Sequence, residues 1–309
     1  MKRVLVTGAA GFIGRHTLRP LLDSGFEVFA ISHSRTRIDL PGVQWRTADL
    51  LEPDAASRLV AELKPSHLLH CAWHMAPADY RNSPENLRWC EASLALIRAF
   101  ADGGGTRVVF AGTCFEYDAR FGFCSETLTP VHPTTLYGIC KNSLRAMALG
   151  FAERAGIGAV WGRTFFVYGP HEAENRLVAS VIINLLRREP ARCTHGEQVR
   201  DFMHVEDVAS AFVALLESDT RGIVNIGSGA PVRLKDIINE IADALDARQM
   251  VRLGAVAAAA DDPPVLLADV RRLHGEIGWR PSIPLEIGLP RTIEWWRRNQ
   301  HHVRPERSP

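Results

Sequence analysis

The sequence lacks a strong charge of either sign. Its 309 residues carry 36 Lys and Arg against 35 Asp and Glu, which gives a formal net charge of +1. Proteins that bind nucleic acid through its phosphates need a positive surface, and this composition offers no electrostatic reason to expect one. We therefore expect no nucleic-acid partner.

Long apolar runs and paired cysteines are also missing. No stretch approaches the roughly 20 apolar residues that a membrane helix needs, and the apolar run after Met1 is too short for a signal peptide. The cysteines are scattered, with no C-x-x-C and no zinc-like pairing with histidine: Cys71, Cys90, Cys114, Cys124, Cys140 and Cys193. We expect free thiols in a reducing cytoplasm, no membrane partner and no metal site.

What the first half of the sequence does contain is a regular alternation of two patterns. Short apolar runs typical of buried strands occupy 4–7, 27–32, 67–72, 107–111 and 160–165. Helical spacing occupies 12–24, 54–63, 84–102 and 137–155 between them. Such alternation predicts an α/β fold, with a doubly wound parallel sheet of the Rossmann type and helices on both faces.

A glycine-rich turn joins the first strand to the first helix. Its sequence, Thr7-Gly-Ala-Ala-Gly-Phe-Ile-Gly14, has the spacing G-x-x-G-x-x-G. Glycines permit a tight turn and let the backbone approach a pyrophosphate, which then lies at the helix N-terminus. Because a strand precedes this turn and a helix follows it, we expect a dinucleotide cofactor at Gly8, Gly11, Phe12, Ile13 and Gly14.

The end of the second strand bears on the choice of cofactor. An acidic residue there would bind the ribose hydroxyls of NAD, whereas Ser32, His33 and Arg35 are followed by no acid before Asp39. Hydroxyls and a guanidinium suit the 2′-phosphate of NADP, so we favour NADP, with NAD possible and a solvated basic loop as the alternative. Further on, Asp49 and Leu50 are candidates for contact with the adenine.

Three polar residues form a candidate catalytic group. Tyr137 and Lys141 are four residues apart, so they share one face of a helix, and a nearby ammonium lowers the pKa of a phenol. Thr113 follows a strand, at the edge of the sheet where ligands bind, and its hydroxyl can orient a reacting oxygen. We predict that Tyr137 exchanges a proton with an alcohol or carbonyl as hydride moves.

The alternation stops after Gly169-Pro170. Helical patterns follow at 176–188, 205–216, 234–245 and 293–298, with one strand candidate at 222–226. We expect residues 1–165 to form the dinucleotide-binding domain, with 201–228 returning to it. Residues 166–200 and 229–309 would form a smaller C-terminal α/β domain that binds substrate, with 301–309 frayed.

The glycine turn, Thr113 and the Tyr137–Lys141 pair together resemble the extended short-chain dehydrogenase/reductases of the NAD-dependent epimerase/dehydratase family. The likeness, which spans nearly the whole chain, extends to His70-Cys71-Ala72 and to the stretches 163–170, 200–207 and 225–229. The resemblance is greatest to nucleotide-sugar 4-ketoreductases and epimerases.

The resemblance implies a nucleotide-sugar substrate and further contacts. Lys141 would also hold the nicotinamide ribose, and Arg200 the substrate diphosphate. The cofactor contacts that it implies are Cys71, Ala72, Tyr137, Lys141, Phe165 and Val167. The substrate contacts that it implies are Thr113, Cys114, Tyr137, Phe166, Asn175, Arg176 and Arg200.

Departures from the family pattern narrow the chemistry. Cys114-Phe115 replace the Asp-Glu that dehydratases carry after the threonine, and Phe166 replaces an asparagine. This argues against dehydration and decarboxylation. We expect NADP(H)-dependent reduction of a nucleotide-linked 4-keto-6-deoxyhexose. The alternatives are a nucleotide-sugar 4-epimerase with retained NAD and a non-catalytic dinucleotide-sensing module, and the retained Thr–Tyr–Lys set speaks against the latter.

Helices 84–102 and 137–155 carry wide apolar surfaces. They include Leu87, Leu94, Leu96, Ile97, Leu144, Met147, Leu149 and Phe151. The family resemblance implies a homodimer in which these helices pair as a four-helix bundle. The alternative is that these residues pack only on the sheet.

Overall fold

The larger sheet consists of seven parallel strands. The computed structural model describes residues 2–34, 37–75, 80–259 and 261–299. The strand order is β11-β7-β5-β4-β1-β2-β3. Their bounds are β1 (Arg3–Thr7), β2 (Glu27–Ser32), β3 (Val43–Thr47), β4 (His67–His70), β5 (Arg107–Thr113), β7 (Gly158–Thr164) and β11 (Gly222–Ile226). Since the order runs outward from β1 in both directions, the predicted doubly wound sheet is confirmed.

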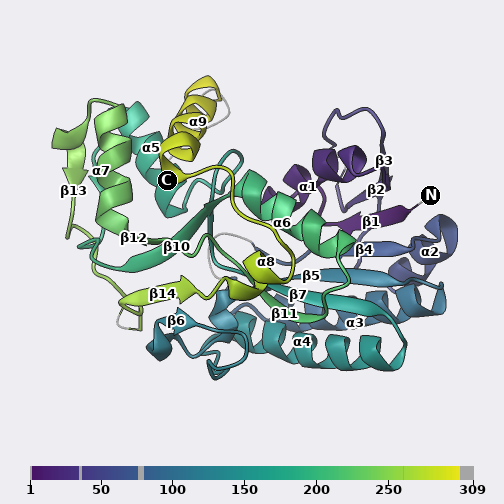
Figure 1. Ribbon diagram of the computed structural model, residues 1–309. Helices are drawn as coiled ribbons and strands as arrows, with labels where there is room; N and C mark the ends of the chain where they lie inside the picture. The colour runs from purple at the N-terminus through teal and green to yellow at the C-terminus, as the bar shows by residue number, and fades with distance from the viewer. Residues whose placement is uncertain (1, 35–36, 76–79, 260, 300–309) are drawn as a thin grey trace.

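Helices cover both faces of this sheet (Figure 1). On one face lie α2 (Ala55–Leu63), α3 (Glu85–Asp102) and α4 (Leu136–Arg154), and on the other α1 (Phe12–Asp23) and α6 (Val205–Glu217). The strands alternate between the two cores: Leu5 packs with the first set, and Val4 and Val6 with the second. The strands read as continuous apolar runs because both of their faces are buried.

A second sheet and a cluster of helices form the rest of the molecule. The strand order is β12-β10-β14-β6, with β8 also paired to β10. The strands of this sheet are β6 (Phe123–Cys124), β8 (Phe166–Tyr168), β10 (Val199–His204), β12 (Pro231–Arg233) and β14 (Val265–Ala268), and β9 (Ala191–Arg192) pairs with β13 (Val251–Arg252) in a separate two-stranded sheet. The helices of this half are α5 (Leu177–Leu186), α7 (Leu234–Ala244) and α9 (Leu285–Arg298), whereas α8 (Arg271–Gly275) packs through Leu273 against the large sheet. Figure 1 shows α5, α7 and α9 grouped at the end of the molecule opposite α2 and β4.

Two expectations for this half need correction. We expected one strand after Gly169, but the chain also forms β10 and several shorter strands. We expected the last helix to begin at 293, whereas α9 begins at Leu285 and contains Pro290. Pro290 is exposed, while Leu289 and Ile293 pack in the core of this half, so burial of the apolar face outweighs the local effect of the proline.

The chain crosses between the two halves more than once. β10 pairs with β8, β12 and β14 in the second sheet. The chain then enters α6, which packs against α1, and β11, which adds to the edge of the large sheet beside β7. In the described ranges no helix is long and apolar enough to cross a membrane, and no cluster of side chains could hold a metal ion.

Candidate active site

The glycine turn forms a cradle free of side chains at the end of β1. Gly8 has a φ of 67°, and a Cβ on it would lie 2.7 Å from the nitrogen of Ala72. A Cβ on Gly14 would overlap the carbonyl oxygen of Gly8. None of the described side chains caps α1, whose N-cap residue is Gly11, so the amides of its first turn can receive an anion. This cradle fits the pyrophosphate of a dinucleotide.

Two of the other predicted cofactor residues adjoin this turn. Cys71 and Ala72 follow β4 and adjoin Gly8, since a Cβ there would also lie 2.8 Å from the carbonyl carbon of Cys71. Phe165 links β7 to β8, and its N–H donates to the carbonyl of Ile226 (3.0 Å). The remaining three, Phe12, Ile13 and Val167, are half-buried in α1 and β8.

The adenosine end of the site carries hydroxyl groups at the end of β2. Ser32 is buried, and its Oγ lies 3.3 Å from the Oγ of Ser34 and accepts a hydrogen bond from the Ser34 N–H. His33 is exposed beside it, and Arg35 lies outside the described residues. Asp49 accepts a hydrogen bond from the N–H of Leu51 (2.9 Å), so one of its carboxylate oxygens stabilises the turn at 49–51. Leu50, between them, is buried.

The structure brings the three candidate catalytic residues together. Thr113 ends β5, while Tyr137 and Lys141 lie in the first two turns of α4. The Tyr137 side chain lies close enough to that of Thr113 for the threonine side chain to act on its pKa. The Lys141 Nζ donates to the carbonyl of Ala111 (2.9 Å). Gly138 permits this approach, because a Cβ on it would lie 2.6 Å from the carbonyl oxygen of Phe115.

The electrostatics of Tyr137 differ from the expectation. We expected its pKa to be lowered by Lys141, but burial raises the pKa of Tyr137, and the neighbouring Tyr80 adds to this. The Thr113 side chain acts to lower the pKa, but by less than burial raises it. The physical reason is that a phenolate at this depth loses its hydration, and this cost outweighs the positive charge of Lys141, whose Nζ lies 6.0 Å from the ring centre. Tyr137 is therefore a protonated phenol, able to donate.

Lys141 is also buried, in an aromatic setting. Its Nζ lies 3.8 Å from the centre of the Trp73 ring. Burial lowers the pKa of Lys141 to about 8, whereas the negative charge of Glu116 acts to raise it. A lysine with this pKa still carries its charge at neutral pH.

Phenylalanines line the site where related enzymes carry polar groups. The rings of Phe115 and Phe166 are 6.2 Å apart between centroids, and those of Phe166 and Phe202 are 5.7 Å apart. Cys114 is buried beside Phe115, and burial raises the pKa of its thiol. Position 115, where the dehydratase pattern has an acid, holds Phe115. The neighbouring acid Glu116 is wholly buried and paired with Arg163, so it cannot serve as a catalytic acid in its place.

Arginines stack on these aromatic rings. The Arg200 Cζ lies 5.4 Å from the Phe166 ring centre, and Arg200 pairs with Asp262 at 2.6 Å. Arg176, the N-cap residue of α5, lies 5.0 Å from the ring centre of Tyr80. Asn175, which was also predicted to contact the substrate, is exposed in the turn before α5. These guanidiniums can bind an anionic group of a substrate only by sharing their present partners.

Sequence reasoning missed three residues of this site. Tyr80 packs edge-on against Tyr137, with 5.2 Å between ring centroids, and Arg81 lies 4.9 Å from the Phe115 ring centre. No pattern in the sequence marks either residue. Glu116 did leave a signal, because Thr113-Cys-Phe-Glu116 has the S/T-x-x-E spacing of a capping box, which forms here.

Comparisons with known proteins decide the family. The model of the NAD dependent epimerase/dehydratase family matches residues 4–227. The chain belongs to this family. The resemblance to the extended short-chain dehydrogenase/reductases is thus confirmed, and the family member described here is an NAD(P)-dependent enzyme.

Individual relatives differ in the reactions for which they are named. UDP-glucuronic acid decarboxylase 1 of Xenopus tropicalis is 27% identical over 97% of this chain and 73% of its own length. UDP-glucuronate 4-epimerase of Thermodesulfobacterium geofontis is 27% identical over 96% of each chain. The structure of MoeE5 in complex with UDP-glucuronic acid and NAD is 31% identical, with a TM-score of 0.86 over 96% of this chain and 99% of that one.

Proposed function

We propose that this enzyme reduces a nucleotide-linked 4-keto-6-deoxyhexose with NADPH. The observation that carries the proposal is the turn after Thr113. Phe115 occupies the place of the family's catalytic acid, and Glu116 is enclosed with Arg163 below it. Elimination of water needs an added acid and base, whereas reduction of a ketone needs one proton donor.

The residues of the chain have distinct roles in this reaction. The cofactor supplies the hydride when it is bound. Tyr137, protonated because it is buried, donates a proton to the C4 oxygen of the sugar. Thr113, whose side chain lies near that of Tyr137, orients that oxygen. Lys141 holds the nicotinamide ribose and carries positive charge beside the phenol.

The proposed preference for NADPH rests on the end of β2. Ser32 and Ser34 present hydroxyls there, and His33 is exposed beside them. No carboxylate stands at 32–34 to accept hydrogen bonds from ribose hydroxyls or to repel a 2′-phosphate. A reductase must exchange its cofactor at each turnover, which suits NADPH as a diffusible reductant.

The proposed sugar specificity rests on the aromatic wall. Phe115 and Phe166 offer an apolar surface to the substrate in place of an acid and an amide. A deoxygenated C6 methyl group loses no hydrogen bond against such a surface, whereas a hydroxymethyl or carboxylate would be desolvated there. Arg176 and Arg200, with Asn175, would hold the diphosphate.

A 4-epimerase with retained NAD is the second candidate. Two observations favour it: a relative named as a 4-epimerase aligns over 96% of this chain, and MoeE5 was solved with NAD. Epimerisation uses the same Thr113, Tyr137 and Lys141. It differs in needing Tyr137 to accept a proton first, which the raised pKa of this phenol opposes in the protein alone. The retained set of Thr113, Tyr137 and Lys141 argues against a non-catalytic sensing module.

One panel experiment tests these candidates. Keto sugar nucleotides with UDP, dTDP, CDP and GDP carriers are mixed with NADPH or NADH, and the products are identified by NMR. The proposed function predicts consumption of NADPH with a 4-keto-6-deoxy substrate and one product stereochemistry at C4. Interconversion of C4 epimers without net cofactor consumption would instead support the epimerase.

A further inference from the structure

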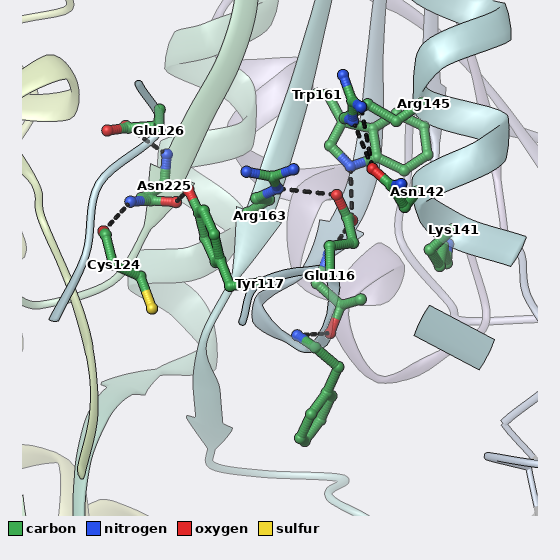
Figure 2. A network of polar contacts seen from close by, with 12 residues as sticks. Glu116, Tyr117, Cys124, Glu126, Lys141, Asn142, Arg145, Trp161, Arg163 and Asn225 are labelled. Atoms are coloured by element: carbon green, nitrogen blue, oxygen red, sulfur yellow. Dashed lines mark hydrogen bonds and ion pairs between the residues drawn. The ribbon is translucent and has the colours of Figure 1, made fainter. Parts of the chain in front are cut away.

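Glu116 lies three residues after Thr113, with both of its carboxylate oxygens hydrogen-bonded (Figure 2). Its Oε2 accepts from the Nε of Arg163 at 2.8 Å. Its Oε1 accepts from the indole N–H of Trp161 (2.8 Å) and from the backbone N–H of Thr113 (3.0 Å). Glu116 and Arg163 are both fully buried. A buried charge is costly unless it is paired and hydrogen-bonded. Both oxygens of Glu116 have partners, whereas the Nη1 and Nη2 of Arg163 have none among the described residues.

The contact with Thr113 fixes the catalytic turn. Thr113 is the N-cap residue of the short 3-10 helix η1 (Cys114–Glu116). Its Oγ1 accepts a hydrogen bond from the N–H of Phe115 (3.3 Å). Glu116 returns the contact by binding the N–H of Thr113, which completes a capping box. The threonine is therefore held at its backbone from one side and at its hydroxyl from the other. The same threonine side chain lies near Tyr137 and acts to lower the pKa of its phenol.

Glu116 also supplies negative charge near Lys141, because the Lys141 Nζ lies 5.9 Å from the ring centre of Trp161, whose indole N–H donates to Glu116. The charged or titratable groups that act on Lys141 are Glu116, Cys71 and Cys90, and Lys141 in turn acts on His70. Burial raises the pKa of both thiols to about 12 and lowers that of His70 to about 3, so all three are neutral near pH 7. Among these neighbours, Glu116 alone is an anion.

Other contacts hold Arg163, the partner of Glu116, in place. Its guanidinium stacks on Tyr117, with Cζ 4.1 Å from the ring centre. The Tyr117 hydroxyl donates to Asn225 (2.7 Å), whose backbone N–H donates to Glu126 (2.9 Å). The network thus runs from Glu126 through Asn225, Tyr117 and Arg163 to Glu116, and Figure 2 shows these side chains.

We propose that Glu116 is a positioning residue for hydride transfer: its carboxylate fixes the backbone of Thr113 and provides the anion that keeps buried Lys141 cationic. The proposal rests on the catalytic roles proposed above for Thr113 and Lys141. Glu116 itself touches neither substrate nor cofactor, because its oxygens are used within the protein.

Lysine-selective NMR can test the charge directly, without substrate or cofactor. The chain has four lysines, at positions 2, 64, 141 and 235, and Lys141 is the buried one. Carbon-13 labelling at Cε gives each lysine its own titration curve, and Lys141→Arg assigns its signal. In Glu116→Gln, which keeps the shape and an acceptor oxygen, we expect the Lys141 midpoint to move to lower pH by on the order of one unit.

A matched control separates this effect from a general weakening of the network. Glu126→Gln removes a carboxylate from the outer end of the same network, where it accepts from Asn225. We expect Glu126→Gln to lower the thermal stability and to leave the Lys141 midpoint unchanged. Equal midpoints in wild type and Glu116→Gln would overturn the proposal.

Glu116→Gln leaves Arg163 buried without a counterion and can fail to fold. The double variant Glu116→Gln with Arg163→Met removes the ion pair as a unit, which proteins tolerate better than the loss of one partner. We expect the Lys141 midpoint to remain below that of wild type in this variant also. A midpoint at or above the wild-type value in the double variant would contradict the assignment of Glu116.

Enzyme kinetics test the positioning of Thr113. With any substrate that the enzyme turns over, we expect Glu116→Gln to reduce kcat roughly tenfold or more with little change in KM. The alkaline limb of the pH profile should move to lower pH together with the Lys141 midpoint. If no sugar nucleotide is turned over, the proposed function fails, whereas the NMR titration still decides whether Glu116 sets the charge of Lys141.

Discussion

Tyr137 is the residue on which the proposed chemistry depends most directly. Replacing it with Phe removes the proton donor and keeps the ring that packs against Tyr80. We expect kcat to fall by about 10²–10⁴-fold, because general acid catalysis contributes that much. Stopped-flow or steady-state oxidation of NADPH measures the loss, and cofactor affinity should stay near its wild-type value.

Tyr168→Phe provides the matched control for this prediction. Tyr168 is as deeply buried as Tyr137, and its hydroxyl has no hydrogen-bond partner among the described residues. Removing that hydroxyl should leave kcat unchanged. Full activity in Tyr137→Phe would show that another group delivers the proton.

Residues of the site could be predicted from the sequence where they occupy a position on a regular element. Thr113 at a strand end and Tyr137 with Lys141 on one helix face are such cases, and the structure places them together. Tyr80 and Arg81 lie in an irregular segment before α3, so their approach to the site depends on tertiary packing. The pKa of Tyr137 also could not be predicted, because burial decides it and spacing does not.

At the scale of elements, the tight turn between β1 and α1 predicts how a substitution at Gly14 affects dinucleotide binding. A Cβ on Gly14 would overlap the backbone of Gly8, which cannot move as a side chain could. We therefore expect Gly14→Ala to weaken dinucleotide binding at least about tenfold, since close backbone approach forms the pyrophosphate site. Titration of NADPH fluorescence measures the affinity.

Gly150→Ala is the matched control for Gly14→Ala, because it makes the same substitution at a glycine outside the turn. Gly150 lies within α4, and a Cβ there would meet nothing within 4 Å. Replacing a helix glycine with alanine stabilises by about 0.5–1 kcal/mol. We expect this variant to bind NADPH as wild type does and to melt at a higher temperature. An unchanged affinity in Gly14→Ala would show that the cradle does not receive the cofactor.

His70 ties three elements together and makes stability depend on pH. Its ring contacts Thr7 of β1 (2.7 Å) and Ser93 of α3 (2.8 Å). Burial lowers the pKa of His70 from 6.5 to about 3, so the folded protein holds it neutral. The unfolded chain binds the proton first, and this contribution to stability is complete above about pH 6.5 and is lost progressively as pH falls toward 3.

We expect the free energy of unfolding to fall with pH below 6.5, with up to about 1.4 kcal/mol per pH unit coming from His70. Urea unfolding at several pH values measures the slope. In His70→Gln the stability at pH 7 should be lower and the slope shallower by that amount. A slope in His70→Gln equal to that of wild type would contradict this account.

Elements differ in how well the sequence predicted them. The strands of the large sheet are apolar throughout because helices cover both faces, and so they stand out. β10 was not recognised, since Arg200, Asp201 and His204 interrupt its apolar residues. Two of these polar groups depend on distant partners, namely Asp262 for Arg200 and the Ser228 N–H for Asp201. Local sequence carries no trace of such contacts.

At the scale of the whole molecule, the site joins two halves of the chain that are far apart in sequence. Arg200 on β10 faces Phe166 on β8, while Thr113 and Tyr137 belong to the large sheet and its helix α4. Ligands of open α/β sheets bind beyond the carboxyl ends of the strands, and that edge is where β8 and β10 approach β5 and β7. A substrate held there would contact both halves.

The outer surface of α3 and α4 bears on the assembly of the molecule. Several residues that suggested a dimer instead pack on the sheet: Leu96, Ile97 and Leu144 are fully buried. Leu87 and Met147, however, are 53% and 47% exposed. The two helices lie side by side (Figure 1), so their outward faces are continuous.

We propose that this face pairs two copies of the chain. Leu94 shares the face of Leu87, seven residues on, and Phe151 shares that of Met147, four residues on, and both are half-buried. Covering these side chains in a four-helix bundle would remove apolar surface from water, at about 25 cal/mol per Å². We expect light scattering at micromolar concentration to give the mass of a dimer.

Met147→Glu should convert this dimer to a monomer, because a carboxylate buried at the interface without a partner costs several kcal/mol. Leu128→Glu is the control, since Leu128 is 77% exposed and belongs to neither helix. Activity separates assembly from folding: Thr113, Tyr137 and Lys141 all come from one chain, so the monomeric variant should still reduce its substrate. If the wild-type protein is monomeric at micromolar concentration, the dimer proposal is wrong, and Leu87 and Met147 are simply exposed to solvent.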